Sequence, residues 1–267
     1  MRRRRLSVPR AGPVAMALAL WLGMSGISLA DDNLRVAVAT NFTRTLGDIA
    51  SAYTEKTGNK VGLSSASTGT LYAQINQGAP FDLFFAADQA RPDKLVATGK
   101  AVADSRFIYA RGVLALYSAD LPLDPDPART LIEGDYAHLA IADPKTAPYG
   151  TAAVAVLEAL EAREPVAPRL IYGKNIGQTF QYVATGHAAI GFVALSQLRD
   201  PDNPLRGRGH VWRVPGSMHL PLDQAAVILE RSPRKPAARG FIDFLRSDAG
   251  RAIIERYGYT LPGAASS

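Results

Sequence analysis

The 267-residue sequence contains no cysteine. Its absence excludes disulfide bonds, thiol catalysis, cysteine-ligated metal sites and a lipid-modified amino-terminal cysteine. An exported protein without disulfides needs a hydrophobic core that is stable by itself, and a chain of this length is long enough to build one.

Long apolar runs are also lacking. The run at residues 14–22 is shorter than the about 20 residues that a membrane-spanning helix needs. It follows the cationic Arg2–Arg5 and precedes Ser28-Leu29-Ala30, whose small residues are typical of a cleavage site. We therefore predict that residues 1–30 are a cleaved signal peptide and that the mature protein, starting at Asp31, is soluble in an extracytoplasmic space.

Outside this segment the sequence has no cationic tract. The whole chain carries 30 Lys and Arg against 24 Asp and Glu, but five of the arginines lie in residues 1–30. The remaining 25 basic residues nearly balance the 24 acidic ones, for a net charge of +1. A nearly neutral protein has no electrostatic surface suited to nucleic acid, so no nucleic-acid partner is predicted.

Motifs of common enzymes are missing as well. The chain has no Gly-x-Ser-x-Gly, no His-Glu-x-x-His and no glycine-rich nucleotide-binding sequence. Serines and four histidines leave a secreted Ser-His-Asp hydrolase as the main alternative from another class. We interpret the histidines as structural or solvated, assign no catalytic residue and predict no enzyme; they are His138, His187, His210 and His219.

What the sequence does contain is an alternation of strands and helices. Strands are predicted at 34–39, 61–66, 81–87, 113–118, 138–143, 169–173, 188–194, 211–214 and 225–230. Helices are predicted at 43–57, 70–77, 150–162, 177–185 and 237–257, and loops at 121–129 and 200–208. This pattern predicts an α/β fold of mainly parallel sheets flanked by helices. The length suits two lobes, residues 31–112 with 225–267 returning to the first, and 113–224 forming the second.

Four predicted strands run directly into helices, and each junction carries a hydroxyl or amide side chain. The candidate donors are Thr40, Asn41, Ser67, Thr68 and Tyr149. A helix start has unpaired N–H groups and a partial positive charge, so it suits an anion. Open α/β sheets also place ligands beyond the carboxyl ends of their strands. The alternative is that these side chains are ordinary helix caps.

At these junctions the sequence resembles the molybdate-binding proteins of bacterial ABC transporters. The resemblance extends in order along the mature chain. The stretches that carry it are Val36–Phe42, Ala66–Ile75, Gly78–Asp88, Ala140–Pro144, Ala147–Gly150, Asn175–Gln178 and Phe241–Tyr259.

The resemblance implies a two-lobed type II periplasmic binding protein fold, with the ligand in the cleft. It implies an oxyanion held by hydroxyl and backbone N–H groups without a charged partner. The implied contacts are Thr40, Asn41, Ser67 or Thr68, Tyr149 and the Ile176 backbone N–H. Some members have a tyrosine where this chain has Ala194, and the Thr40-Asn41 pair with Tyr149 resembles another branch of the family.

The predicted function is capture of molybdate, or of tungstate, and delivery to an inner-membrane ABC permease. The metal is part of the ligand and is held through hydrogen bonds, so no cofactor is predicted, and the protein is expected to be a monomer. The alternative within the same fold is another small anion such as sulfate or phosphate.

Two groups of charged residues near the junctions have their own interpretations. Asp82 and Asp88 are predicted to cap turns, with a metal or supporting role as the alternative. Arg44, Lys145 and Lys174 are interpreted as solvated surface cations, with steering of the incoming dianion as the alternative.

Overall fold

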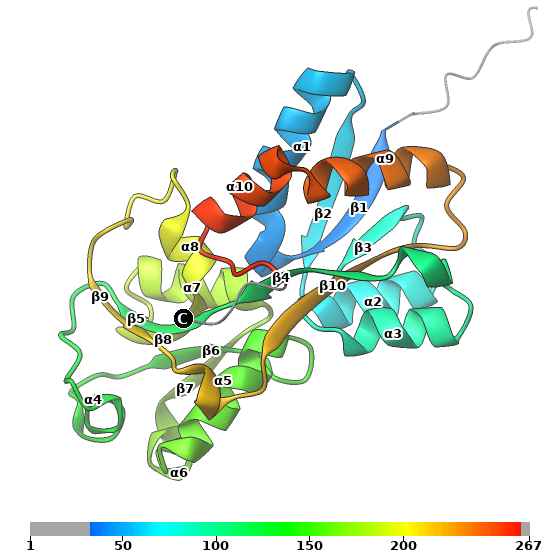
Figure 1. Ribbon diagram of the computed structural model, residues 1–267. Coiled ribbons are helices and arrows are strands. Elements are labelled where there is room, and N and C mark those ends of the chain that lie inside the picture. The colour runs from blue at the N-terminus through cyan, green and yellow to red at the C-terminus, as the bar shows by residue number, and fades with distance from the viewer. Residues whose placement is uncertain (1–32, 263–267) are drawn as a thin grey trace, which may run out of the picture. The chain divides into compact units, whose positions relative to one another are not determined.

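The computed structural model describes residues 33–262, and the predicted signal peptide lies outside them. The described residues belong to one compact unit that contains two five-stranded sheets (Figure 1). Within this range no helix has the length and apolar character needed to cross a membrane.

The first sheet has the strand order β2-β1-β3-β10-β4. β1 pairs in parallel with both β2 and β3, whereas β10 is antiparallel to its neighbours β3 and β4. Four strands therefore run in one direction and one in the other, a mainly parallel sheet as predicted. The strands are β1 (Leu34–Ala39), β2 (Val61–Ala66), β3 (Leu83–Phe85), β4 (Phe107–Gly112) and β10 (Leu222–Ile228).

The second sheet repeats this plan in the order β7-β6-β8-β5-β9. β6 is parallel to β7 and β8, and β5 is antiparallel to β8 and β9. Its strands are β5 (Leu114–Ser118), β6 (Leu139–Ala142), β7 (Leu170–Gly173), β8 (Ile190–Ala194) and β9 (His210–Arg213).

Helices cover both faces of the first sheet (Figure 1). Val36 and Val38 of β1 point to a core built with α1 (Thr43–Thr57), α9 (Lys235–Arg246) and α10 (Asp248–Arg256). The alternate residue Ala37 points to a second core with α2 (Thr68–Asn76) and α3 (Ala90–Ala97). Because neighbouring strand residues face opposite sides, the continuous apolar run of β1 fits a strand buried on both faces.

The second sheet is covered in the same way. Leu139 and Ile141 of β6 face a core that includes α4 (Pro127–Glu133), α5 (Pro148–Ala159) and α6 (Arg163–Val166). Ala140 faces α7 (Ile176–Ala184) and α8 (Leu195–Arg199). The remaining short elements are the 3-10 turns η1 (Thr40–Phe42), η2 (Ala103–Ser105), η3 (Ala167–Arg169) and η4 (Gly216–Met218).

The chain passes between the sheets twice. It leaves the first sheet after Gly112, the last residue of β4, and returns between β9 and β10. The lobe boundaries at 112/113 and 224/225 stay predictions, because the contacts group all described residues as one unit.

Five helices and strands differ from the sequence-based expectations. β4, α3, α6 and α8 were not predicted, and α4 begins at Pro127, inside the segment 121–129 that was predicted to be a loop. The Asp126 side chain accepts the Ala128 N–H, and Pro127 takes the first helical position. A capping residue followed by proline is a signal for a helix start, but the polar, proline-rich composition of this segment is also typical of a loop.

Candidate functional site

The candidate site lies where four strands end and helices begin. β1 leads into η1 at Thr40, β2 into α2 through Ser67, β6 into α5 through residues 143–147, and β7 into α7 at Asn175. Two of these junctions belong to each sheet. Direct contacts join them: the Gly69 N–H of α2 donates to the Thr146 carbonyl before α5, at 2.9 Å.

The first junction supplies Thr40 and Asn41. The Thr40 hydroxyl oxygen lies 3.4 Å from the Ser65 hydroxyl, which donates to it. Asn41 is buried, and its amide nitrogen donates to the Gln224 side-chain oxygen at 2.8 Å and to the Tyr259 hydroxyl at 3.1 Å. Both amide hydrogens are therefore engaged within the protein, which the sequence did not indicate.

The second junction distinguishes Ser67 from Thr68. Ser67 is the N-cap of α2: its hydroxyl oxygen accepts the Thr70 N–H and lies 2.7 Å from the Thr70 hydroxyl. The Thr68 hydroxyl oxygen accepts the Ala87 N–H at 3.0 Å, and the side chain is 1% exposed. A hydroxyl that accepts a bond keeps its own hydrogen for donation. Ser67 thus caps α2 through its oxygen, and either its hydroxyl or that of Thr70 donates in the bond between them. Thr68 retains a buried donor.

The third junction places Tyr149 in the first turn of α5. Its side chain is 2% exposed, and its hydroxyl oxygen accepts from the Gln224 amide nitrogen at 3.3 Å. Burial raises the pKa of Tyr149 well above its ordinary value, and Tyr259 adds to the rise. The Tyr149 hydroxyl lies against the backbone of Gly112, where an added Cβ would come within 2.1 Å of the oxygen.

The fourth junction brings α7 against the first sheet. The Asn175 side chain caps α7 by accepting the Gln178 N–H, and Ile176 is the first helical residue. The backbone at Gly177 packs on Thr40, since an added Cβ would meet the Thr40 methyl carbon at 2.4 Å. The start of α7 thus lies beside the first junction.

A buried network of polar side chains connects these junctions, and most of its members were not predicted. The Ser196 hydroxyl donates to the Asn41 carbonyl at 3.0 Å, and the Tyr259 hydroxyl donates to the same carbonyl at 2.7 Å. Gln224 bonds to Asn41, Tyr109 and Tyr149. The only sequence signal for Gln224 is a single amide within the otherwise apolar end of its strand.

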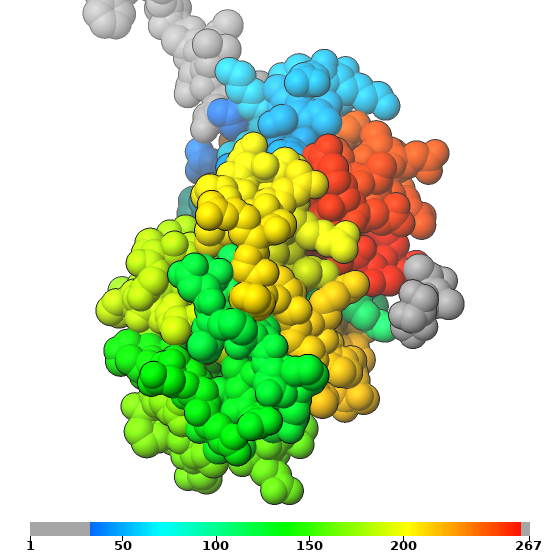
Figure 2. Space-filling view, turned by 90° about the vertical axis from the view of Figure 1, so that its left-hand side faces the viewer, coloured from blue at the N-terminus to red at the C-terminus, as the bar shows by residue number. Residues whose placement is uncertain are grey.

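A groove of about 410 Å³ opens beside the first junction, lined by residues that include Thr40, Asn41, Gly177 and Ser196. At its rim the Arg44 guanidinium donates to Asp200 at 2.9 Å and pairs with Asp202. Figure 2 shows the segment around residue 200, in yellow, against the blue of α1. The hydrogen bond to Asp200 raises the pKa of Arg44. Arg44 therefore ties two parts of the chain together.

The other charged residues singled out in the sequence lie outside the network. Lys145 and Lys174 have exposed side chains. Asp88 accepts the Arg91 N–H three residues on, as expected of a carboxylate that caps a turn. Asp82 does not cap a turn: it accepts from the Arg35 backbone N–H and from the Ser232 hydroxyl, which are distant in the chain, and so has a supporting role. Within residues 33–262 no group of three or more His, Asp and Glu residues is placed to hold a metal ion.

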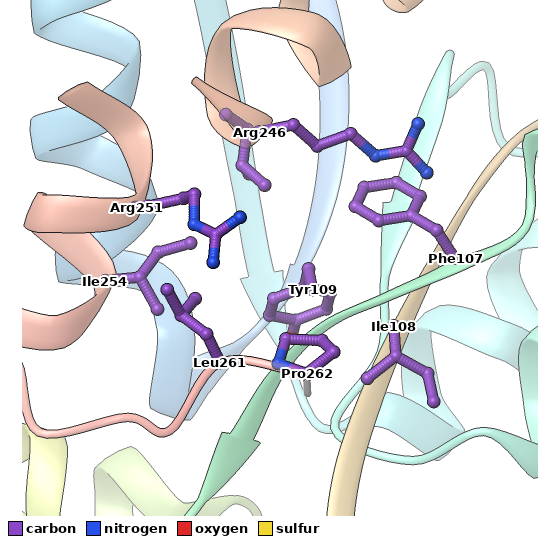
Figure 3. A pocket seen from close by; sticks show the side chains of 9 residues that line it. Phe107, Ile108, Tyr109, Arg246, Arg251, Ile254, Leu261 and Pro262 are labelled. Atoms are coloured by element: carbon purple, nitrogen blue, oxygen red, sulfur yellow. The ribbon is translucent and has the colours of Figure 1, made fainter. Parts of the chain in front are cut away.

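A separate pocket of about 270 Å³ lies between β4, α9, α10 and the segment around Leu261. Figure 3 shows the side chains of Arg246 and Arg251 above Tyr109 in this pocket. The Arg246 guanidinium lies over the Phe107 ring, 4.1 Å from its centre. This pocket offers cationic groups, in contrast to the uncharged donors at the strand ends.

Three tyrosines of the buried network predict a loss of stability in alkaline solution. Burial raises the pKa of Tyr109, Tyr149 and Tyr259 above the ordinary value near 10. Above about pH 10 the unfolded chain releases these phenolic protons while the folded protein keeps them. The free energy of unfolding should therefore be unaffected below pH 9 and fall above pH 10 by up to about 1.4 kcal/mol per pH unit for each tyrosine. Urea denaturation at several pH values measures this slope, which should become shallower in Tyr259→Phe.

Comparison with known proteins gives consistent likenesses along the chain. Residues 34–260 match the family model described as bacterial extracellular solute-binding protein. The chain is 44% identical to the molybdate-binding protein ModA of Azotobacter vinelandii, over 92% of this chain and 97% of the relative. It is 42% identical to ModA of Rhodobacter capsulatus, over 94% and 96%.

Solved structures agree with this. The periplasmic molybdate-binding protein of Azotobacter vinelandii superposes with a TM-score of 0.82 at 37% identity, over 86% of this chain and 99% of that one. The sulfate-binding protein SubI of Mycobacterium tuberculosis has a TM-score of 0.69 at 11% identity, which is a likeness of fold alone. These likenesses, with the two sheets, confirm the predicted two-lobed periplasmic binding protein fold.

Proposed function

This chain belongs to the bacterial extracellular solute-binding protein family, and from that premise we propose that it captures molybdate and delivers it to an ABC permease. The observation that carries the proposal is the nearly full-length likeness to two molybdate-binding relatives at 44% and 42% identity. The strand-end junctions add support, since they hold uncharged donors of the kind that suits a fully deprotonated oxyanion.

We assign the ligand shell to groups that still have a hydrogen to donate. These are the hydroxyls of Thr40, Thr68 and Tyr149, together with backbone N–H groups at the helix starts, among them that of Ile176. Ser67 is the alternative to Thr68, since its oxygen accepts the Thr70 N–H and either hydroxyl donates in its bond to Thr70. Asn41 takes part through its backbone N–H because its side-chain hydrogens are engaged. A dianion held by neutral donors gains charge-assisted hydrogen bonds without a buried cation.

Selectivity follows from size and protonation. A smaller sulfate would leave some of the buried donors without a partner, and each unpaired donor costs about 1–3 kcal/mol. A protonated phosphate would bring a hydrogen to a shell made of N–H and O–H donors. Tungstate has nearly the size and shape of molybdate, so it is expected to bind with similar affinity.

Titration calorimetry tests this proposal directly. The mature protein should bind molybdate and tungstate at least about thirty-fold more tightly than sulfate or phosphate, because two unpaired donors cost about 2–6 kcal/mol together. Arg251→Ala is the control for binding in the pocket of Figure 3, and its affinity for molybdate should equal that of the wild type. Equal affinity for sulfate and molybdate would refute the size argument, and lost binding in Arg251→Ala would move the site to that pocket.

The cellular setting forms part of the same proposal. We place the protein in the periplasm after cleavage near Ala30, where it presents the loaded form to the permease as a monomer. Amino-terminal sequencing of exported protein tests the cleavage point. The relatives are named as binding proteins, and we propose no catalysis. Hydrolysis of ester or phosphoester substrates that disappears in a histidine-to-alanine variant would contradict this.

A further inference from the structure

Gln224 is a fully buried amide within an apolar strand. It lies in β10 with 0% exposure, and Ala225, Ala226 and Val227 follow it in the core. The register between β10 and β4 shifts between Gln224 and Ala225. An irregularity of this kind turns a side chain away from its regular direction in the sheet.

The contacts of Gln224 fix which way its amide faces. Its oxygen accepts from the Asn41 amide nitrogen and from the Tyr109 hydroxyl, both at 2.8 Å; the single Tyr109 hydrogen is shared with the more distant Ala86 carbonyl, at 3.1 Å. A carbonyl oxygen has two lone pairs, so both are used. Turning the amide over would place its nitrogen against the Asn41 nitrogen, two donors face to face. The Gln224 nitrogen is thereby directed at the Tyr149 hydroxyl oxygen, 3.3 Å away.

This arrangement determines the direction of the Tyr149 hydrogen bond. Because the tyrosine oxygen accepts from Gln224, its single hydrogen is left for another acceptor. Tyr109 begins the chain of bonds, with its ring at the pocket of Figure 3 and its hydroxyl at Gln224. The hydrogen bonds in this series are all donated in the same direction: Tyr109 and Asn41 donate to Gln224, and Gln224 donates to Tyr149.

We propose that Gln224 is a positioning residue that holds the Tyr149 hydroxyl as a donor toward the bound oxyanion, an inference that rests on the proposed function. Gln224 acts through Tyr149 and fixes the direction of its hydrogen bond. An oxyanion only accepts hydrogen bonds, so the tyrosine that faces it must donate. The same chain of bonds disfavours a ligand that carries its own hydrogen at this position.

The test is Gln224→Glu in the mature protein, titrated with molybdate between about pH 6.5 and 9. A carboxylate only accepts, so it takes the Tyr149 hydrogen and repels the dianion. A protonated carboxyl group accepts and donates as the amide does, and burial beside a dianion raises its pKa into this range. We expect affinity to fall at least about a hundred-fold at pH 9 and to recover about ten-fold or more near pH 6.5. The affinity of the wild type should change less than about two-fold over this pH range, because the raised pKa keeps Tyr149 protonated.

Two further variants keep the result interpretable. Gln74→Glu makes the same chemical change at an exposed position of α2 and should bind as the wild type does at every pH. Gln224→Met keeps the volume without polar atoms; it should lose about ten-fold or more in affinity with no pH dependence. If Gln224→Glu does not fold, the affinity of Gln224→Met for molybdate decides whether Gln224 has the proposed role.

The outcomes separate the two proposals. Three results would overturn the role of Gln224 and leave the proposed function intact. They are wild-type affinity of Gln224→Glu at pH 9, an affinity loss in Gln224→Glu that is the same at every pH, and wild-type affinity of Gln224→Met. Failure of the wild-type protein to bind molybdate and tungstate would overturn the proposed function and, with it, this inference.

Discussion

Replacing Tyr149 with phenylalanine is expected to weaken molybdate binding by about ten- to a hundred-fold. The change removes one hydrogen bond to a charged ligand, and such bonds contribute about 1.5–3 kcal/mol. It also leaves the buried Gln224 amide nitrogen without the acceptor that it has at 3.3 Å. Calorimetric titration of the mature variant with molybdate measures the loss.

A second tyrosine provides a matched control for Tyr149→Phe. Tyr136 is also buried, and its hydroxyl donates to the Leu131 carbonyl at the end of α4, among the helices that cover the second sheet. Tyr136→Phe therefore removes a buried hydroxyl without touching the strand-end network, and it should bind molybdate as the wild type does. Unchanged affinity in Tyr149→Phe would exclude Tyr149 from the ligand shell.

Replacing Gly112 with alanine is expected to abolish tight binding and to destabilise the protein. The new Cβ would lie 2.1 Å from the Tyr149 hydroxyl oxygen and 2.5 Å from the Gln224 amide nitrogen. Both atoms are buried, so the added methyl displaces the donor proposed for the ligand. Overpacking of a core costs about 1–3 kcal/mol, which lowers the melting temperature by about 2–12 °C for a protein of this size.

Gly62 is the control for this substitution, because it is also a strand glycine of the first sheet. A Cβ added there would meet only the Leu34 carbonyl oxygen, at an ordinary contact distance of 3.6 Å. Gly62→Ala should keep wild-type affinity and lose little stability. Differential scanning calorimetry and titration of both variants check the pair, and wild-type binding by Gly112→Ala would show that the Tyr149 position is not needed for binding.

Local features of the sequence were enough to predict much of the fold. Leu46, Ile49 and Tyr53 recur at helical spacing and are buried in α1, which ends at Gly58 with a positive φ of 77°. The apolar run of β1 likewise indicated a strand buried on both faces. Such patterns depend on spacing along the chain, which the sequence displays directly.

The prediction was weaker where an element departs from a simple pattern. β4 (Phe107–Gly112) mixes aromatic, small and charged residues, and its exposed Arg111 interrupts the apolar run. α4 lies in a segment whose Pro and Asp residues are also typical of loops. For β4, pairing with β10 decides the conformation, and spacing along the chain does not show which strands pair.

The sequence by itself determined that this protein has strand ends leading into helix starts, with uncharged donors at Thr40, Thr68 and Tyr149. Those features arise from residues adjacent in the chain. Only the tertiary structure decided which donors remain free. Asn41 and Gln224, 183 residues apart, satisfy each other, and Ser196 reaches the Asn41 carbonyl from 155 residues away. A buried polar group must find a partner wherever the fold brings one, so the direction of each hydrogen bond is a property of the packed molecule.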